Sequence, residues 1–135
     1  MTTIERINPE SLHQNPAFTQ AVRIPAGMDT IYVGGQNGVG KDGRVVSPGI
    51  AEQTRQAMAN LTACLKEAGA ELTDVVKWTV LLVDGADLMA GFQAFSETWP
   101  RGAVPPIVTG AMVPNLAVPG ALVEIEALAV VPPRS

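Results

Sequence analysis

The chain has 135 residues, 47% of them hydrophobic and 4% aromatic, which predicts one domain with a mainly aliphatic core. Its formal net charge is −4 and its nine Lys and Arg residues are scattered, which disfavours binding to nucleic acid or to an anionic membrane surface. The single cysteine excludes an intrachain disulfide and, with the polar N-terminus, predicts a cytoplasmic location. We expect a single domain over residues 1–135, with tails at 1–15 and 131–135.

Two short β-rich runs form the first predicted element. The stretches "AFTQAVRIP" (17–25) and "TIYVGG" (30–35) flank a Gly-Met-Asp turn, and this pattern predicts a hairpin. The glycines of "GGQNGVGKDG" (34–43) fit neither a Walker loop nor a GxGxxG turn, so this segment is predicted to be a loop. The following "GRVV" (43–46) is compatible with a short extra strand.

A helix is predicted over residues 48–68. Ser47 is a typical N-cap, Pro48 suits the first helical position, and Gly69 is typical of a helix end. Apolar residues recur between them at helical spacing, and Cys64 lies on this stripe, so we expect it to be buried and inert. The next run, "DVVKWTVLLVD" (74–84), is apolar in both phases and predicts a strand with most of both faces covered.

The second predicted helix begins at Asp84 or Asp87 and ends before Pro100. One face carries a stripe that is more typical of a core than of a pocket, namely Leu88, Phe92, Phe95 and Trp99. The 22 residues between Arg101 and Glu124 hold no ionisable side chain, but their prolines and glycines exclude a membrane-spanning helix. They predict two strands, "PPIVTGAMV" (105–113) and "GALVEIEALAVV" (120–131), joined by a loop.

The element order ββαβαββ predicts an α+β two-layer sandwich, in which a mixed sheet carries two helices on one face. In the last strand, one face is small and apolar enough to lie under the helices: Val123, Ile125, Ala127 and Ala129. The other face is largely apolar but carries two carboxylates: Leu122, Glu124, Glu126, Leu128 and Val130. We expect this second face to be buried against another subunit of a cyclic homo-oligomer.

The order of elements and four stretches of sequence resemble the Rid/YjgF family, once labelled L-PSP endoribonucleases. The stretches are "FTQAVRI", "IYVGGQ", "IAEQTRQAMANLTACLKEAGAELTDVVKWTVLLVD" and "GALVEIEALAVV". The resemblance implies a chorismate-mutase-like fold and a homotrimer, with sheets lining a central barrel and three clefts between subunits. In the best-known branch of the family, each cleft hydrolyses enamines and imines such as 2-aminoacrylate to ketoacids and ammonia.

The resemblance also implies roles for particular residues. Glu124 matches the glutamate that positions or activates the hydrolytic water. The branch binds the substrate carboxylate with an arginine in a "P-x-R-S/T" stretch, but Ile107 stands at the arginine position of the matching "P-P-I-V". The remaining positions expected to contact substrate are Phe18, Gly34, Gly35, Phe92, Val108 and Thr109. The sequence shows no His, Cys and carboxylate cluster with metal-ligand spacing, so neither a metal nor another cofactor is expected.

Loss of the arginine changes the expected chemistry. A bidentate Arg–carboxylate contact is charge-assisted, so its absence should weaken binding of a small imino acid by about 10–1000-fold. We therefore expect Glu124-assisted hydrolysis or deamination of an imine, enamine or related compound, with poor activity on 2-iminoacids. The alternative is a non-catalytic trimer that binds a small molecule or has a regulatory role. For Glu124 itself, the alternative is a solvated carboxylate on an exposed sheet face. A ribonuclease is disfavoured by the acidic charge.

Overall fold

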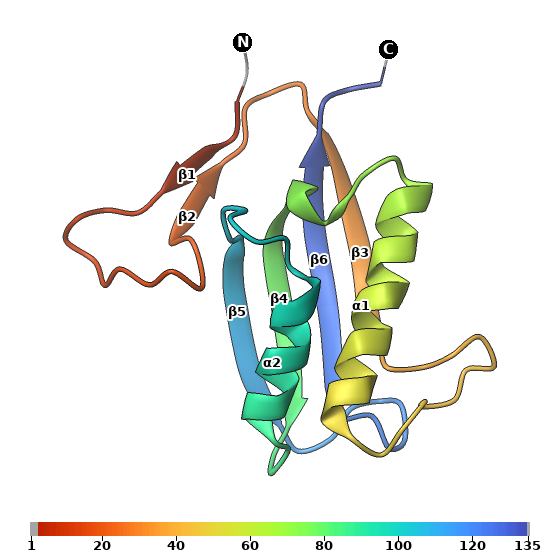
Figure 1. Ribbon diagram of the computed structural model, residues 1–135. Helices are drawn as coiled ribbons and strands as arrows, with labels where there is room; N and C mark the ends of the chain where they lie inside the picture. The colour runs from red at the N-terminus through yellow and green to blue at the C-terminus, as the bar shows by residue number, and fades with distance from the viewer. Residues whose placement is uncertain (1–2, 135) are drawn as a thin grey trace.

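The computed structural model describes residues 3–134, which form a four-stranded sheet under two helices and a small separate hairpin (Figure 1). The elements in chain order are β1 (Glu5–Ile7), β2 (Ala21–Arg23), β3 (Asp29–Asn37), α1 (Ile50–Glu67), the 3₁₀ turn η1 (Leu72–Asp74), β4 (Val75–Val83), α2 (Leu88–Thr98), β5 (Ile107–Val113) and β6 (Val123–Val131).

The main sheet has the strand order β3-β6-β4-β5. β6 runs antiparallel to both of its neighbours, whereas β4 and β5 are parallel because α2 connects them across one face. Both helices lie on that same face (Figure 1). The predicted α+β sandwich with a mixed sheet and two helices on one side is therefore confirmed.

The predicted hairpin of residues 17–35 is wrong. β2 pairs with β1, so that residues 5–7, within the expected N-terminal tail, form a strand. β3 pairs instead with β6, almost a hundred residues later. The turn at Gly27, which has a φ of +89°, is present but separates strands of two different sheets. Local turn chemistry indicated the bend, but the burial of Val33 under α1 decided the partner of β3.

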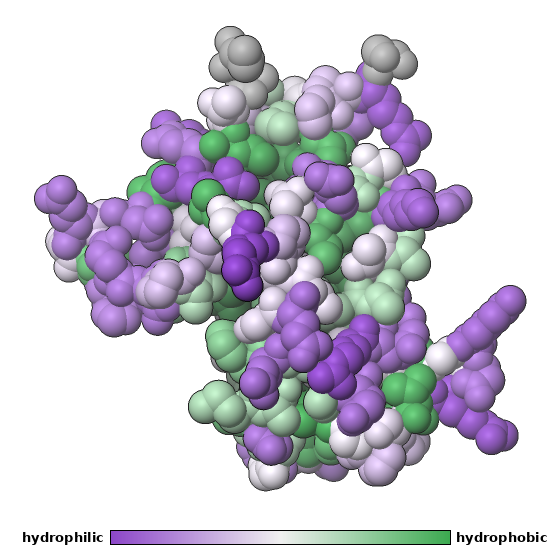
Figure 2. Space-filling view, viewed as in Figure 1, coloured by the Kyte–Doolittle hydropathy of each residue, from purple (hydrophilic) through white to green (hydrophobic). Residues whose placement is uncertain are grey.

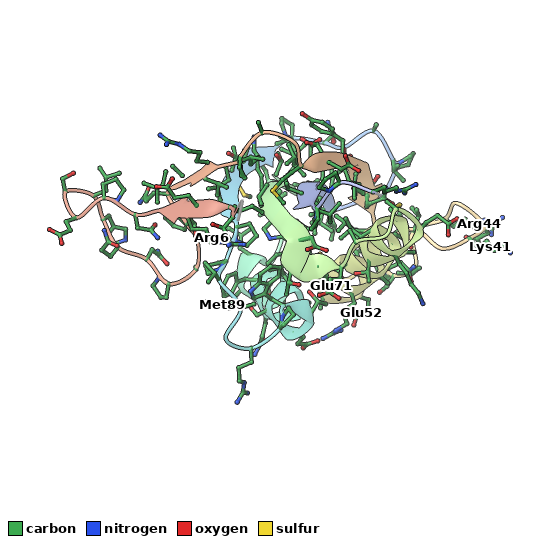
Figure 3. All side chains as sticks on the ribbon, turned by 90° about the horizontal axis from the view of Figure 1, so that it is seen from above. Arg6, Lys41, Arg44, Glu52, Glu71 and Met89 are labelled. Carbon is green, nitrogen blue, oxygen red and sulfur yellow. The ribbon has the colours of Figure 1, made fainter. Side chains whose placement is uncertain are left out.

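Hydrophilic side chains gather on two projections of the molecule. Figure 2 shows one over the β1–β2 connection and the other over the loop that follows β3. Lys41 and Arg44 extend outward at the end of this loop, on the opposite side from the hairpin (Figure 3). A bridge between Val39 and Val45 closes the loop and is all that forms of the extra strand expected at 43–46.

The first helix begins two residues later than predicted. Gly49 is the N-cap, and the Ser47 hydroxyl accepts a hydrogen bond from the Gly49 N–H at 3.2 Å instead of capping the helix. The C-terminal end agrees with the prediction within one residue, because Gly69 follows the cap in the left-handed region with a φ of +83°. The helix direction and its buried face are unaffected by the shift.

Gln53 fastens the start of α1 to two loops. Its side chain is fully buried, and its Nε2 donates to the carbonyls of Ser47 at 2.9 Å and Gly120 at 3.1 Å. Its Oε1 accepts from the Leu122 N–H at 2.7 Å. The chain also packs closely here, since a Cβ on Gly38 would overlap the Gln53 backbone. This buried amide therefore sets the position from which β6 starts.

Cys64 is exposed, which corrects its expected burial. The buried stripe of α1 instead follows Thr54, Met58, Leu61 and Leu65. Cys64 lies beside this stripe on the solvent side, because neighbouring helical residues are rotated by about 100°.

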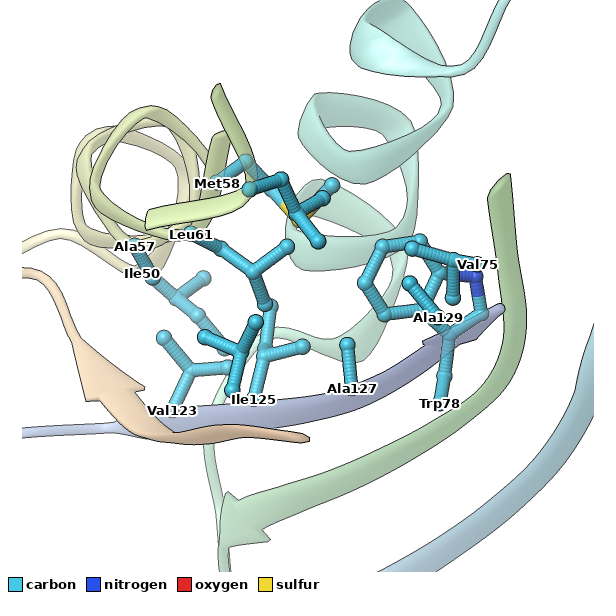
Figure 4. Packing of buried hydrophobic residues seen from close by; sticks show 12 residues of the cluster. Ile50, Ala57, Met58, Leu61, Val75, Trp78, Val123, Ile125, Ala127 and Ala129 are labelled. Atoms are coloured by element: carbon cyan, nitrogen blue, oxygen red, sulfur yellow. The ribbon is translucent and has the colours of Figure 1, made fainter. Parts of the chain in front are cut away.

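The helices cover a core of Val, Leu, Ile, Ala and Met side chains around Trp78. Figure 4 shows residues of α1 over those of β6, with the Trp78 ring between β4 and α2. Trp78 makes edge contacts with Phe95 and Trp99, whose ring centroids lie 5.3 and 6.1 Å away. The N-terminal half of the predicted α2 stripe is not part of this core, because Leu88 and Phe92 are exposed. The Asp87 side chain caps this helix by accepting from the Ala90 N–H.

The last strand divides as the alternation predicted, with one exception. Val123, Ile125, Ala127 and Ala129 are buried under the helices. On the other face Glu124 and Leu128 are half-buried and Glu126 is exposed, whereas Val130 is fully buried within the chain.

Two helices are also joined at their surface. The Arg55 guanidinium donates to Glu97 at 3.0 Å and lowers the pKa of that carboxyl through this hydrogen bond.

Within residues 3–134, neither helix has both the length and the apolar content needed to cross a bilayer.

Candidate functional site

Glu124 lies near the start of β6 on the sheet face that the helices leave open. Its Oε1 accepts a hydrogen bond from the Asn37 Nδ2 at 3.3 Å. The same amide group donates to the Val123 carbonyl at 3.0 Å, and Asn37 is only 8% exposed. A buried amide that makes two hydrogen bonds therefore holds one oxygen of the half-buried Glu124 carboxylate.

A β-bulge in β3 makes room for this carboxylate. The register of β3 against β6 shifts between Val33 and Gln36, so Gly34 and Gly35 bow away from the regular ladder. A Cβ on Gly35 would overlap the Glu124 carboxylate and would lie 2.8 Å from its Cδ. Only glycine lets the backbone come this close. The "VGGQN" stretch thus forms the floor on which the Glu124 side chain rests.

Ile107 and Thr109 share the open face with Glu124 but lie far from it. In the sheet register, Ile107 is paired with Lys77, and Lys77 with Leu128. Ile107 is therefore two strands across and four residues along from Glu124, a separation of about 16 Å at ordinary strand spacings. Thr109 is about 12 Å from Glu124 by the same reasoning. These residues do not meet Glu124 within one chain.

The other expected contact residues lie on the opposite side of the sheet. Phe18, Phe92 and Val108 line a pocket of about 320 Å³ between α2 and the helix side of β4 and β5. The Thr19 hydroxyl, which donates to the Pro105 carbonyl at 2.6 Å, fastens the segment containing Phe18 beside β5. The predicted residues therefore form three groups within a chain: Glu124 with Gly34 and Gly35, Ile107 with Thr109 elsewhere on the open face, and the three residues on the helix side.

The sequence interpretation missed two residues of the open face. Asn37 holds Glu124, and its role follows only from the pairing of β3 with β6. Lys77 places a cation on the strand beside Ile107. Strand alternation was a usable signal for Lys77, because the adjacent Trp78 points to the core. In residues 3–134, no group of three His, Cys, Asp or Glu side chains is arranged to hold a metal.

Comparison with known proteins places the chain in a family. The family model described as endoribonuclease L-PSP matches residues 9–131. The chain belongs to this family. A 2-iminobutanoate/2-iminopropanoate deaminase of Rattus norvegicus is 40% identical over 116 residues, which cover 84% of this chain and 80% of the relative. The Homo sapiens protein of the same name is 37% identical over 115 residues, covering 84% and 79%.

Solved structures of the L-PSP family have the same fold. A Rid-family protein of Yersinia pestis, YyfB, described as of unknown function, superposes with a TM-score of 0.80 at 30% identity, covering 93% of this chain and 97% of that one. RidA from an Antarctic Psychrobacter gives a TM-score of 0.68 at 29% identity, covering 84% and 87%. The resemblance to the Rid/YjgF family and to its fold is confirmed.

Proposed function

We propose that this protein is a Rid-family hydrolase that uses Glu124 to deaminate an imine, an enamine or a related compound. The observation that carries the proposal is the half-buried Glu124 carboxylate, which the buried Asn37 holds over the backbone of Gly35. Deaminases named for 2-iminobutanoate and 2-iminopropanoate, up to 40% identical to this chain, support the reaction class. The net charge of −4 disfavours an RNA substrate.

We further propose that the site is completed between subunits of a homotrimer. On the open face, Tyr32 is 79% exposed in the isolated chain, and Leu81, Ile107 and Leu128 are only partly buried. The separation of about 16 Å between Glu124 and Ile107 gives a second reason, because only another copy can bring a β5 edge to a Glu124 carboxylate. Phe18, Phe92 and Val108 would contribute to the cleft from that neighbouring subunit.

The reaction follows from the chemistry of a positioned carboxylate. Glu124 accepts a proton from water while the water oxygen attacks the carbon of the protonated imine, forming a carbinolamine. The Glu124 carboxylic acid then returns this proton to the nitrogen. The C–N bond breaks, a carbonyl forms, and the hydroxyl proton leaves with ammonia as ammonium. Proton transfer by a positioned group contributes about 10²–10⁴-fold to such a rate.

Replacing Glu124 with glutamine should lower kcat by about 100-fold or more, because the amide retains the shape and the Asn37 contact but cannot accept the proton. The assay is ammonia release from a panel of imines, enamines and lactams, run beside Glu126→Gln as a control from the same face. Comparable losses in the two variants would contradict the role of Glu124.

Replacing Ile107 with arginine should raise kcat/KM on 2-iminopropionate by about 10–1000-fold, because the guanidinium supplies a bidentate partner for the substrate carboxylate. The wild type should be poor on this substrate. Efficient turnover by the wild type would contradict this specificity, and loss of that turnover in Lys77→Met would then identify the replacement cation.

The apolar residue at position 107 also favours a second candidate, a trimer that binds a small molecule without transforming it. In that case, no compound of the panel releases ammonia, yet some of them raise the melting temperature through preferential binding to the folded state. Ammonia release that depends on Glu124 excludes this candidate.

A further inference from the structure

The strand β5 carries a glycine that nothing in the chain requires. Gly110 is the middle residue of this strand, lines the pocket between α2 and the sheet, and is paired with Val80 of β4. Its φ is not positive, and a Cβ at this position would meet only the Val80 carbonyl, at 3.9 Å. A side chain therefore fits, although a glycine here weakens the strand. Such a glycine often marks a place where a ligand comes close to the backbone.

The glycine on the α2 side of the same pocket, Gly91, has an explanation within the chain. A Cβ at this position would lie 3.1 Å from the Ile50 Cδ1, so the close packing of α2 against α1 favours glycine there. Gly35 is explained in the same way by the Glu124 carboxylate. At Gly110 the space remains open, and it forms part of the pocket of about 320 Å³.

The pocket beside Gly110 is lined almost wholly by apolar atoms. Leu88 and Phe92 of α2 are 46% and 59% exposed in its wall. The described wall contains no ionisable side chain, and its polar side-chain atoms, the Thr54 Oγ1 and the Trp78 Nε1, have almost no accessible surface. A carboxylate placed here would lose its water with nothing to offset the loss. The volume exceeds the roughly 150 Å³ of an apolar cavity that holds benzene, so an aromatic or branched aliphatic group fits.

We propose that this pocket holds the side chain of the substrate and that Gly110 sets the size of side chain that the cleft accepts. The inference rests on the proposed function, in which three residues of the pocket wall belong to the substrate cleft: Phe18, Phe92 and Val108. The substrate is then an imine or enamine whose C–N group lies at the Glu124 carboxylate and whose aromatic or branched aliphatic side chain lies beside Gly110. Ile107 suits such a substrate, because its binding depends on apolar burial and not on an ion pair.

The first experiment compares imines that differ only in their side chain. An amino-acid oxidase generates them in situ from alanine, leucine and phenylalanine, and the spontaneous hydrolysis measured without the protein is subtracted. All three carry the carboxylate for which Ile107 offers no partner, so this shared loss cancels when their kcat/KM values are divided. The leucine and phenylalanine imines should exceed the alanine imine by about tenfold or more, because added methylene groups in an apolar pocket favour the larger substrate. A ratio near one or below overturns the proposal.

Gly110→Val tests the location, with Gly110→Ala as the intermediate case. Valine suits a strand and extends into the pocket, so the kcat/KM ratio of the phenylalanine imine to the alanine imine should fall by about 10–100-fold. The smaller side chain of Gly110→Ala should lower this ratio by less. Melting temperature and oligomeric size establish that both variants are folded. An unchanged ratio in folded Gly110→Val overturns the assignment to this pocket.

Failure of the proposed function gives a different result. If the wild type accelerates the hydrolysis of none of these imines, or if Glu124→Gln slows none, the deaminase proposal fails and the pocket is tested by binding alone. Phenylacetone and acetone keep the side chains of phenylalanine and alanine, with a methyl group in place of the carboxylate. At equal concentration, phenylacetone should raise the melting temperature of the wild type more than acetone does, and this difference should disappear in Gly110→Val. Equal effects in the wild type, or a difference that Gly110→Val retains, overturn the proposal whether or not the imines are hydrolysed.

Discussion

Replacing Gly35 with alanine should lower the turnover of an imine substrate by about 100-fold with little loss of stability. The new Cβ would overlap the Glu124 carboxylate, so that side chain must move by roughly 1 Å, and a displacement of that size at a catalytic group costs about 10²-fold. The fold should tolerate the change, because the φ of Gly35 is not positive and the obstacle is the end of a flexible side chain. Steady-state kinetics and thermal melting measure the two effects.

A double-mutant cycle separates this mechanism from a general disturbance of β3. In the Glu124→Ala background, the carboxylate that the new methyl group would displace is gone, so adding Gly35→Ala should cause no further loss of activity. Gly34→Ala serves as the control for folding and oligomeric size, since a Cβ at that position meets nothing within 4 Å in the chain. An additional loss in the Glu124→Ala background would show that Gly35 acts by another route.

Replacing Gln53 with leucine should lower the free energy of unfolding by about 3–5 kcal/mol. Leucine has a similar volume, but it leaves the carbonyls of Ser47 and Gly120 and the N–H of Leu122 without their partner in a buried place. Each unsatisfied group costs about 1–3 kcal/mol, and water reaching the loops recovers part of the sum. Urea unfolding followed by circular dichroism measures the change.

The matched control for this prediction is Gln56→Leu, one turn further along the same helix. Gln56 donates only to the Asn60 side chain at 2.8 Å, so its loss should cost about 1 kcal/mol or less. Equal destabilisation by the two substitutions would mean that the loss of amide side chains from α1, and not the fastening of the two loops, determines stability. If Gln53→Leu kept the free energy of unfolding of the wild type but changed kcat or KM, a purely structural role for Gln53 would likewise be contradicted.

The elements of the fold were readable wherever a periodic pattern coincided with a boundary signal. The stripe of α1 ending at Gly69, the Asp87 cap of α2 and the alternation from Val123 to Ala129 are local features. They predicted α1 within two residues and β6 within three, and Asp87 was one of the two starts expected for α2. The prediction was wrong where the pairing partner of a strand had to be chosen. Gly27 indicates a bend, but nothing local states that β3 pairs with β6, because that pairing is decided by which residues the helices cover.

The family, the two-layer fold, the glutamate at position 124 and the isoleucine at the arginine position, Ile107, could all be read from the sequence. The tertiary structure decided how these residues are related. The β3 bulge and the buried Asn37 fix Glu124 on the open face, whereas the strand order places Ile107 about 16 Å away and Phe92 on the other side of the sheet. The physical reason is that alternation assigns a residue to a face, but only long-range pairing and packing determine which faces and edges come together.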